Sequence, residues 1–197
     1  MVDVELYGGR RGYLAHLQAR ALHALGVYSR LGEINWASVG QLVFICKGNI
    51  CRSPYASARA QLLGVPTASF GLEAAEGTPP DPAAAHNARL RGVDLSVHRS
   101  ARLDKSRIRE DDLLIVFEPQ QLNAVRQRCD ARTVSVTLLG LCVRPPRPHI
   151  HDPYGRSDRY FQQCFGIIDA GVSELARRWL QTSRQTADSA VSRPMVY

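Results

Sequence analysis

A short apolar segment that runs into a cysteine is the feature that most constrains this chain. Residues 41–46 are predicted to form a buried strand, and Arg52 follows Cys46 after five residues. A glycine and an asparagine inside this loop favour a turn, and Pro54 suits the first turn of a helix. Strand, loop and helix start would direct backbone N–H groups into one concavity, which favours an anion and the thiolate of Cys46. The planar guanidinium of Arg52 suits two oxygens of a phosphate.

A simpler interpretation competes with this one. A single cysteine after an apolar strand is most often a small buried hydrophobe, and a cysteine and an arginine at this spacing arise easily by chance among 25 Lys and Arg residues. The turn within the loop and the helix start at Ser53 and Pro54 favour a phosphate-transfer site with a sulfur nucleophile.

Composition limits the class of protein. A chain of 197 residues with 45% hydrophobic and 22% charged residues is typical of one globular domain. The apolar runs are too short to span a bilayer, and no secretory signal is recognisable. Five cysteines, an odd number without framework spacing, indicate free thiols in a reducing compartment, so a cytoplasmic location is expected. No Cys/His spacing indicates a structural zinc ion.

The net charge of +7 raises the question of nucleic-acid binding. Residues 89–109 carry seven basic and two acidic side chains, but no aromatic residue lies among them to stack on bases. We therefore expect no nucleic-acid partner and interpret this segment as a solvated basic face, with steering of an anionic substrate as the weaker functional alternative.

Strand and helix patterns alternate along the chain, which predicts an α/β fold with a doubly wound parallel sheet and helices on both faces. In such sheets the ligand site lies beyond the carboxyl ends of the strands, where the loop after residue 46 would be. Further strands are expected at residues 67–70, 112–117 and 134–139, and helices at 53–63, 82–90, 120–128 and 159–181.

The loop Cys46–Pro54 fills every fixed position of C-x-G-N-x-C-R-S-P, and an Asp-Pro pair lies far downstream at Asp152. With residues 92–100 and 112–118, these motifs resemble the low-molecular-weight protein tyrosine phosphatases, in particular the bacterial branch. The resemblance spans residues 40–180. It implies a four-stranded, flavodoxin-like sheet of the phosphotyrosine protein phosphatase I type.

The resemblance also implies how the site works. Cys46 would attack phosphorus and form a phosphocysteine, Arg52 would bind the phosphoryl oxygens, and Asp152 would serve as general acid and then base. Ser53 would steady the Cys46 sulfur, Asn49 would take a left-handed conformation, and Tyr154 would form a wall of the substrate pocket. Neither a metal nor another cofactor is implied. Phosphate binding and loop support are expected from Lys47, Gly48, Asn49, Ile50, Cys51 and Ser53.

Two positions depart from the family pattern. Lys47 would make the rim of the site more cationic than usual, and Phe70 replaces a typical alanine. Cys51 is a second thiol near Cys46, so a redox-sensitive site is expected, in which a disulfide protects an oxidised nucleophile.

Three regions are expected along the chain: an N-terminal extension (residues 1–39), a phosphatase domain (40–182) and a polar, mobile tail (183–197). The extension contains an amphipathic helical pattern, which would pack against the core or against a second copy of the chain. The apolar residues of this pattern are Tyr13, Leu14, Leu17, Ala21, Leu22 and Leu25.

The expected substrate is a phosphotyrosine-containing protein, with a bacterial tyrosine kinase as the opposing enzyme in exopolysaccharide regulation. Three alternatives remain. A thiol-dependent arsenate reductase would need relay cysteines, for which Cys129 and Cys142 bracket a predicted strand and are poorly placed. A protein-arginine phosphatase would prefer threonine at Ile50. A non-catalytic phosphotyrosine-binding module would show no turnover.

Overall fold

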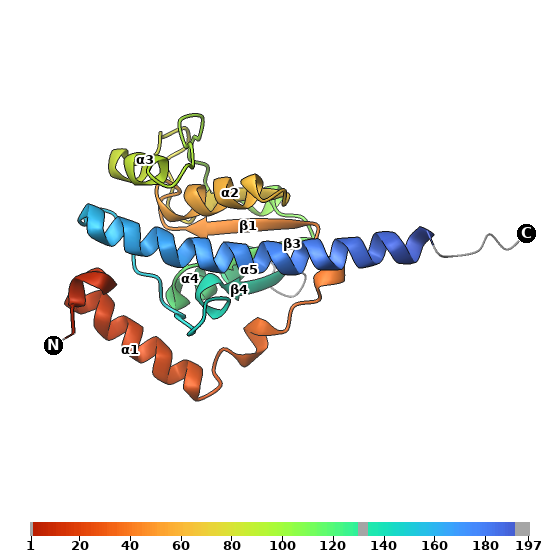
Figure 1. Cartoon of the computed structure of the whole chain (residues 1–197), viewed down its shortest axis with the longest axis horizontal. Coiled ribbons are helices and arrows are strands. Elements are labelled where there is room, and N and C mark those ends of the chain that lie inside the picture. Colours follow the sequence, from red (N-terminus) through yellow and green to blue (C-terminus); the bar gives the residue numbers. More distant parts are fainter. Residues whose placement is uncertain (1, 130–133, 192–197) are drawn as a thin grey trace, which may run out of the picture.

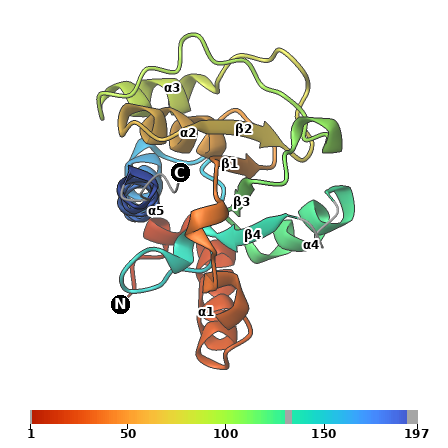
Figure 2. The same ribbon diagram turned by 90° about the vertical axis from the view of Figure 1, so that its right-hand side faces the viewer.

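The computed structural model describes residues 2–129 and 134–191, with side chains up to residue 186. Its centre is a sheet of four parallel strands in the order β2-β1-β3-β4 (Figures 1 and 2). This order confirms the doubly wound, flavodoxin-like fold. It also places β1 where the strand order reverses, which is where ligands bind in such sheets. The strands are β1 (Gln41–Cys46), β2 (Thr67–Gly71), β3 (Asp112–Val116) and β4 (Ser135–Leu138).

Helices cover both faces of the sheet (Figure 2). The side chains of β1 alternate between the two faces, as the twofold period of a strand requires. Leu42 and Phe44 pack with residues of α2, α3 and α5, whereas Val43 and Ile45 pack with residues of α4. All four are fully buried. The helices are α2 (Arg52–Leu62), α3 (Pro82–Arg89), α4 (Pro119–Arg128) and α5 (Asp158–Val191).

Helix α5 is longer than the sequence pattern indicated. The apolar repeat predicted a helix over residues 159–181, but α5 continues to Val191. The polar tail expected at residues 183–197 is therefore helical up to Val191, and residues 192–197 lie outside the described residues; the mobility of the tail stays a prediction. No glycine or proline interrupts residues 182–191, so nothing in the local sequence stops the helix. The apolar repeat ends earlier because this part of α5 extends past the body of the protein (Figure 1).

The N-terminal extension contains the expected helix, but the helix packs through a different face. In α1 (Arg10–Ala24) the buried residues are Gly12, His16 and Ala19. Leu14 is 65% exposed and Leu17 is 42% exposed. Of the predicted apolar stripe, Leu22 packs on the α4 face of the sheet, but Leu14 and Leu17 do not pack on the core; packing of the stripe on a second copy stays a prediction. Gly12 and Ala19 lie on the opposite face, and their small size lets the helix approach the body closely. This close packing outweighs the larger apolar area that the leucines would bury.

Short 3₁₀ segments complete the extension: η1 (Val4–Tyr7), η2 (Ser29–Gly32) and η3 (Trp36–Ser38). Tyr28 and Leu31 are buried against the α4 face of the sheet. The indole Nε1 of Trp179 in α5 donates to the carbonyl oxygen of Val39 at 2.9 Å. The C-terminal part of the extension is therefore joined to the body by apolar packing and by a hydrogen bond. Among the helices that the structure describes, none has the length and apolar content needed to cross a membrane.

Candidate active site

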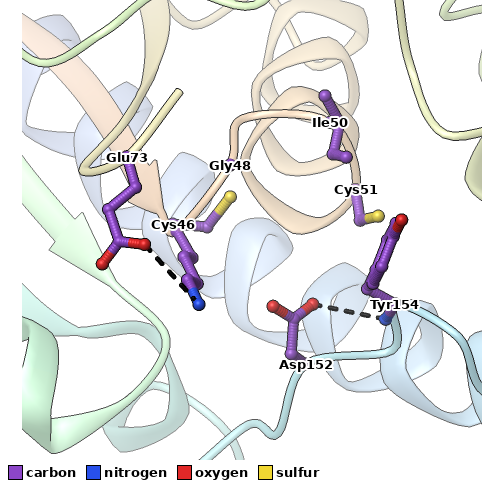
Figure 3. A pocket seen from close by; sticks show the side chains of 8 residues that line it. Cys46, Gly48, Ile50, Cys51, Glu73, Asp152 and Tyr154 are labelled. Carbon is purple, nitrogen blue, oxygen red and sulfur yellow. Dashed lines mark hydrogen bonds and ion pairs between the residues drawn. The ribbon is translucent and has the colours of Figure 1, made fainter. Parts of the chain in front are cut away.

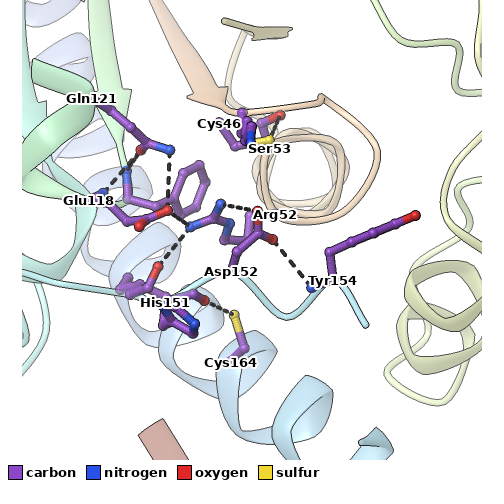
Figure 4. A network of polar contacts seen from close by, with 12 residues as sticks. Cys46, Arg52, Ser53, Glu118, Gln121, His151, Asp152, Tyr154 and Cys164 are labelled. Carbon is purple, nitrogen blue, oxygen red and sulfur yellow. Dashed lines mark hydrogen bonds and ion pairs between the residues drawn. The ribbon is translucent and has the colours of Figure 1, made fainter. Parts of the chain in front are cut away.

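The loop between β1 and α2 curls around the sulfur of Cys46. The backbone N–H of Asn49 donates to Sγ of Cys46 at 3.3 Å, and the hydroxyl of Ser53 lies 3.1 Å from the same atom (Figure 4). Asn49 has a φ of 56°, the left-handed conformation expected for it. Helix α2 begins at Arg52, so its N-terminal N–H groups lie at the same loop. These contacts fix the position of the sulfur inside the loop.

The side chain of Asn49 ties this loop to its neighbours. Its Nδ2 donates to the hydroxyls of Ser53 and Ser69 at 2.8 and 2.9 Å, and its Oδ1 accepts from the N–H of Ala101 at 2.9 Å. Its carbonyl oxygen lies 2.8 Å from Nε2 of His98, which must donate because a carbonyl only accepts. Burial lowers the pKa of His98. The loop is therefore held rigid before any substrate binds.

Arg52 is fully buried beneath the loop. Its Nη1 donates to Glu118 and, at 2.9 Å, to the carbonyl oxygen of Ile150, while Nη2 lies 2.8 Å from Oδ2 of Asp152. The Nε of Arg52 has no hydrogen-bond partner among the described residues. A buried N–H without an acceptor is costly, and an oxyanion bound in the loop would supply one.

Glu118 is a functional residue that the sequence analysis did not identify. It lies two residues after the end of β3 and forms a capping box with Gln121 at the start of α4. Burial opposes its ionisation, but Arg52 and His149 lower the pKa of Glu118 to about 2. The carboxylate therefore stays charged and fixes the guanidinium of Arg52. Its place at the carboxyl end of the strand beside β1 was the signal that could have found it.

Asp152 enters the site from the loop before α5. Its side chain is 33% exposed, and its Oδ1 accepts from the backbone N–H of Tyr154 at 3.3 Å. Asp152 and Tyr154 form one wall of a cavity of about 250 Å³ above Cys46 (Figure 3). The remaining lining residues are Lys47, Gly48, Ile50, Cys51 and Glu73.

The rim of this cavity is less cationic than Lys47 alone predicted. The Nζ of Lys47 lies 3.6 Å from a carboxylate oxygen of Glu73, and both side chains are exposed. The acidic partner, which the sequence analysis did not identify, offsets the extra positive charge. Phe70 does not line the cavity; it packs on the α4 face of the sheet, with the guanidinium of Arg107 5.9 Å from its ring centre.

The structure thus brings together the residues singled out in the sequence. Cys46, Arg52 and Asp152 converge from three segments, and Asn49 and Ser53 support the loop from behind. Burial raises the pKa of the Cys51 thiol, so Cys51 is unsuited to be the attacking thiolate at neutral pH. A thiol held by N–H and O–H groups, a buried guanidinium and a half-buried carboxyl define the site of a cysteine-dependent phosphatase.

Comparison with known proteins identifies the family. A model of the family described as low molecular weight phosphotyrosine protein phosphatase matches residues 41–186. The probable low molecular weight protein-tyrosine-phosphatase EpsP of Ralstonia nicotianae is 36% identical over 133 residues, covering 66% of this chain and 90% of EpsP. The chain therefore belongs to this family, and the prediction of a bacterial-type protein tyrosine phosphatase is confirmed.

Solved structures show the same fold. Wzb of Vibrio vulnificus, in complex with benzylphosphonate, has a TM-score of 0.65 at 29% identity and covers 71% of this chain and 98% of its own. The YwlE arginine phosphatase from Geobacillus stearothermophilus has a TM-score of 0.65 at 27% identity and covers 74% of this chain and 96% of its own. The N-terminal 40 residues lie outside the family match.

Proposed function

We propose that the chain hydrolyses phosphotyrosine through a phosphocysteine on Cys46, with Asp152 as general acid and base. The observation that carries this proposal is that Cys46 and Asp152 line one cavity, while the buried guanidinium of Arg52 pairs with Asp152 at 2.8 Å. The guanidinium lies between the carboxylates of Glu118 and Asp152, so its orientation is set before substrate arrives. Such preorganised charge stabilises a transition state without reorganisation cost.

The reaction has two steps. In the first, the Cys46 thiolate attacks phosphorus, the bond to the phenolic oxygen breaks, and Asp152 gives that oxygen its proton. In the second, the Asp152 carboxylate takes a proton from water, the resulting hydroxide attacks phosphorus, and Cys46 leaves as a thiolate. Arg52 and the loop N–H groups bind the phosphoryl oxygens in both steps.

The cavity supports an aromatic substrate. Ile50 and Tyr154 lie on its lining and offer surface to a flat ring, and the related Wzb binds benzylphosphonate, which carries an aromatic ring next to its phosphonate. We propose a phosphotyrosine-containing protein as substrate and a bacterial tyrosine kinase as the opposing enzyme, in the cytoplasm. A role in exopolysaccharide regulation and self-association through α1 remain predictions.

An arsenate reductase is disfavoured by the positions of Cys129 and Cys142, the two candidates for its relay cysteines. Cys129 packs on the α4 face of the sheet and Cys142 packs on the α5 face. Because the sheet separates them, they cannot exchange a disulfide within this fold. A non-catalytic binding module is disfavoured because the nucleophile and the acid are both present at one cavity.

A protein-arginine phosphatase is the remaining alternative. A comparison of phosphotyrosine and phosphoarginine substrates distinguishes it from a tyrosine phosphatase. We expect kcat/KM for a phosphotyrosine peptide to exceed that for a matched phosphoarginine peptide by about 10-fold or more, the scale of discrimination that an apolar pocket supplies. Ile50→Thr should narrow this ratio. A wild-type preference for phosphoarginine would assign the chain to the alternative activity, and no turnover of either peptide would revive the binding module.

Redox sensitivity is expected because Cys46 and Cys51 share one cavity. Peroxide would oxidise the Cys46 thiolate to a sulfenic acid. The thiol of Cys51 would then condense with this sulfenic acid, which gives a disulfide and water. After peroxide and then a thiol reductant, the wild type should recover most of its activity and Cys51→Ser should recover less. Cys129→Ser, on the α4 face, is the control. If all three proteins recovered the same fraction of activity, Cys51 would not protect Cys46 from irreversible oxidation.

A further inference from the structure

The N-terminal extension reaches the loop that carries Asp152. Residues 3–12, called here the N-terminal segment, lie at the start of α5 (Figure 1). Residues 149–157, called here the acid loop, lead from β4 and η5 (Leu139–Leu141) into α5. The N-terminal segment lies outside the family match at 41–186, so its contacts are additional to those within the matched domain.

On one side of Asp152, the N-terminal segment packs on the preceding residue. The backbone of Gly8 lies so close to the ring of His151 that a Cβ at position 8 would be 2.3 Å from Cδ2. A Cβ at Gly12 would lie 3.1 Å from Cγ of the same ring. The hydroxyl of Tyr160 donates to the carbonyl oxygen of His151 at 3.2 Å. His151 is thus held between the glycines and the first turn of α5.

On the other side of Asp152, the contacts are polar. The hydroxyl of Ser157 donates to a carboxylate oxygen of Glu5 at 2.6 Å. Arg159 forms ion pairs with Asp3 at 2.7 Å and with Glu5 at 3.2 Å. Exposed ion pairs contribute little individually, but these hold the first turn of α5, where the acid loop ends.

We propose that the N-terminal segment is a positioning element for Asp152, which fixes the acid loop from both sides of that residue. Among the described residues, the carboxyl of Asp152 makes polar contacts with Arg52 and with the N–H of Tyr154, so its location depends on the loop that carries it. A general acid must lie within hydrogen-bond reach of the leaving oxygen, and a displacement of about 1 Å can cost about 10²-fold in rate. The inference rests on the proposed acid role of Asp152.

The test uses Gly8→Ala with Gly26→Ala as matched control. Both glycines have a positive φ, 81° and 78°, so both substitutions introduce similar backbone strain. Only at position 8 does the new Cβ meet His151, because nothing lies within 4 Å at position 26. For Gly8→Ala we expect kcat/KM for phenyl phosphate, whose leaving group needs a proton, to fall by about 10-fold or more. The value for 4-nitrophenyl phosphate should stay within about threefold, and Gly26→Ala should change neither.

A second pair keeps the test decisive if Gly8→Ala does not fold. Glu5→Lys places a cation against Arg159, and Glu33→Lys makes the same change at an exposed site elsewhere in the extension. We expect only Glu5→Lys to lower kcat/KM for phenyl phosphate selectively, by about threefold. Parallel losses on both substrates, or no difference between each variant and its control, would overturn the proposal. Asp152→Asn serves as reference: if its own loss is not selective for phenyl phosphate, the acid role fails rather than the positioning role.

Discussion

Cys46→Ser is expected to lower hydrolysis of aryl phosphates by at least about 10⁴-fold, the scale of loss when a covalent nucleophile is removed. A serine hydroxyl at this site lacks a base to remove its proton and stays a weak nucleophile. The loop should survive, because Asn49 is tied to Ser69 and Ala101 independently of the sulfur. Binding of benzylphosphonate, measured by calorimetry, should therefore be retained.

Cys51→Ser is the matched control for this substitution. Cys51 lines the same cavity and undergoes the same change of sulfur to oxygen, but burial raises the pKa of its thiol. We expect substantial activity in this variant. If Cys51→Ser were inactive and Cys46→Ser active, the assignment of the nucleophile would be reversed.

Asp152→Asn is expected to lower kcat/KM for phenyl phosphate by about 10²–10⁴-fold, the usual contribution of a general acid. The loss on 4-nitrophenyl phosphate should be much smaller, because 4-nitrophenolate leaves without a proton. Asparagine keeps the size of the side chain and an oxygen that can accept from the N–H of Tyr154, so the acid loop should keep its conformation.

Arg52→Lys is the comparison for Asp152→Asn, because it should lower kcat/KM for phenyl phosphate and for 4-nitrophenyl phosphate to the same extent. A lysine ammonium cannot reproduce the planar fork that binds two oxygens at once. It would also leave Glu118 with a poorer partner in a buried position. Equal losses on the two substrates for Asp152→Asn would count against an acid role for Asp152.

Much of the domain could be predicted because its signals are local. The apolar run at β1 reproduces its observed bounds, and the proline at the start of α2 and the Asp81–Pro82 pair before α3 mark helix starts correctly. The left-handed conformation of Asn49 was implied by the family resemblance, and Asn is one of the few residue types that tolerate it. Each of these features depends on a few adjacent residues.

Glu118 and Glu73 could not be assigned in this way, because their roles depend on which segments lie side by side. The capping box of Glu118 and Gln121 predicts a helix start but does not reveal that the same carboxylate pairs with Arg52, 66 residues earlier. Likewise, the leucines of α1 indicated a packed face, but the glycine and alanine on the opposite side approach the body more closely. The roles of Glu118 and Glu73 and the buried face of α1 depend on the tertiary structure, which the periodicity of the sequence does not reveal.

The most direct test of the mechanism is to trap the covalent intermediate. In Asp152→Asn, 4-nitrophenyl phosphate should still phosphorylate the enzyme, while hydrolysis is slow because the base that activates water is missing. Rapid acid quenching, trypsin digestion and mass spectrometry would locate the phosphoryl group, and cleavage after Lys47 places Cys46 and Cys51 on separate peptides. We expect the phosphoryl group on the Cys46 peptide. A phosphoryl group on any other residue, or no phosphoenzyme while the substrate is being turned over, would contradict the phosphocysteine mechanism.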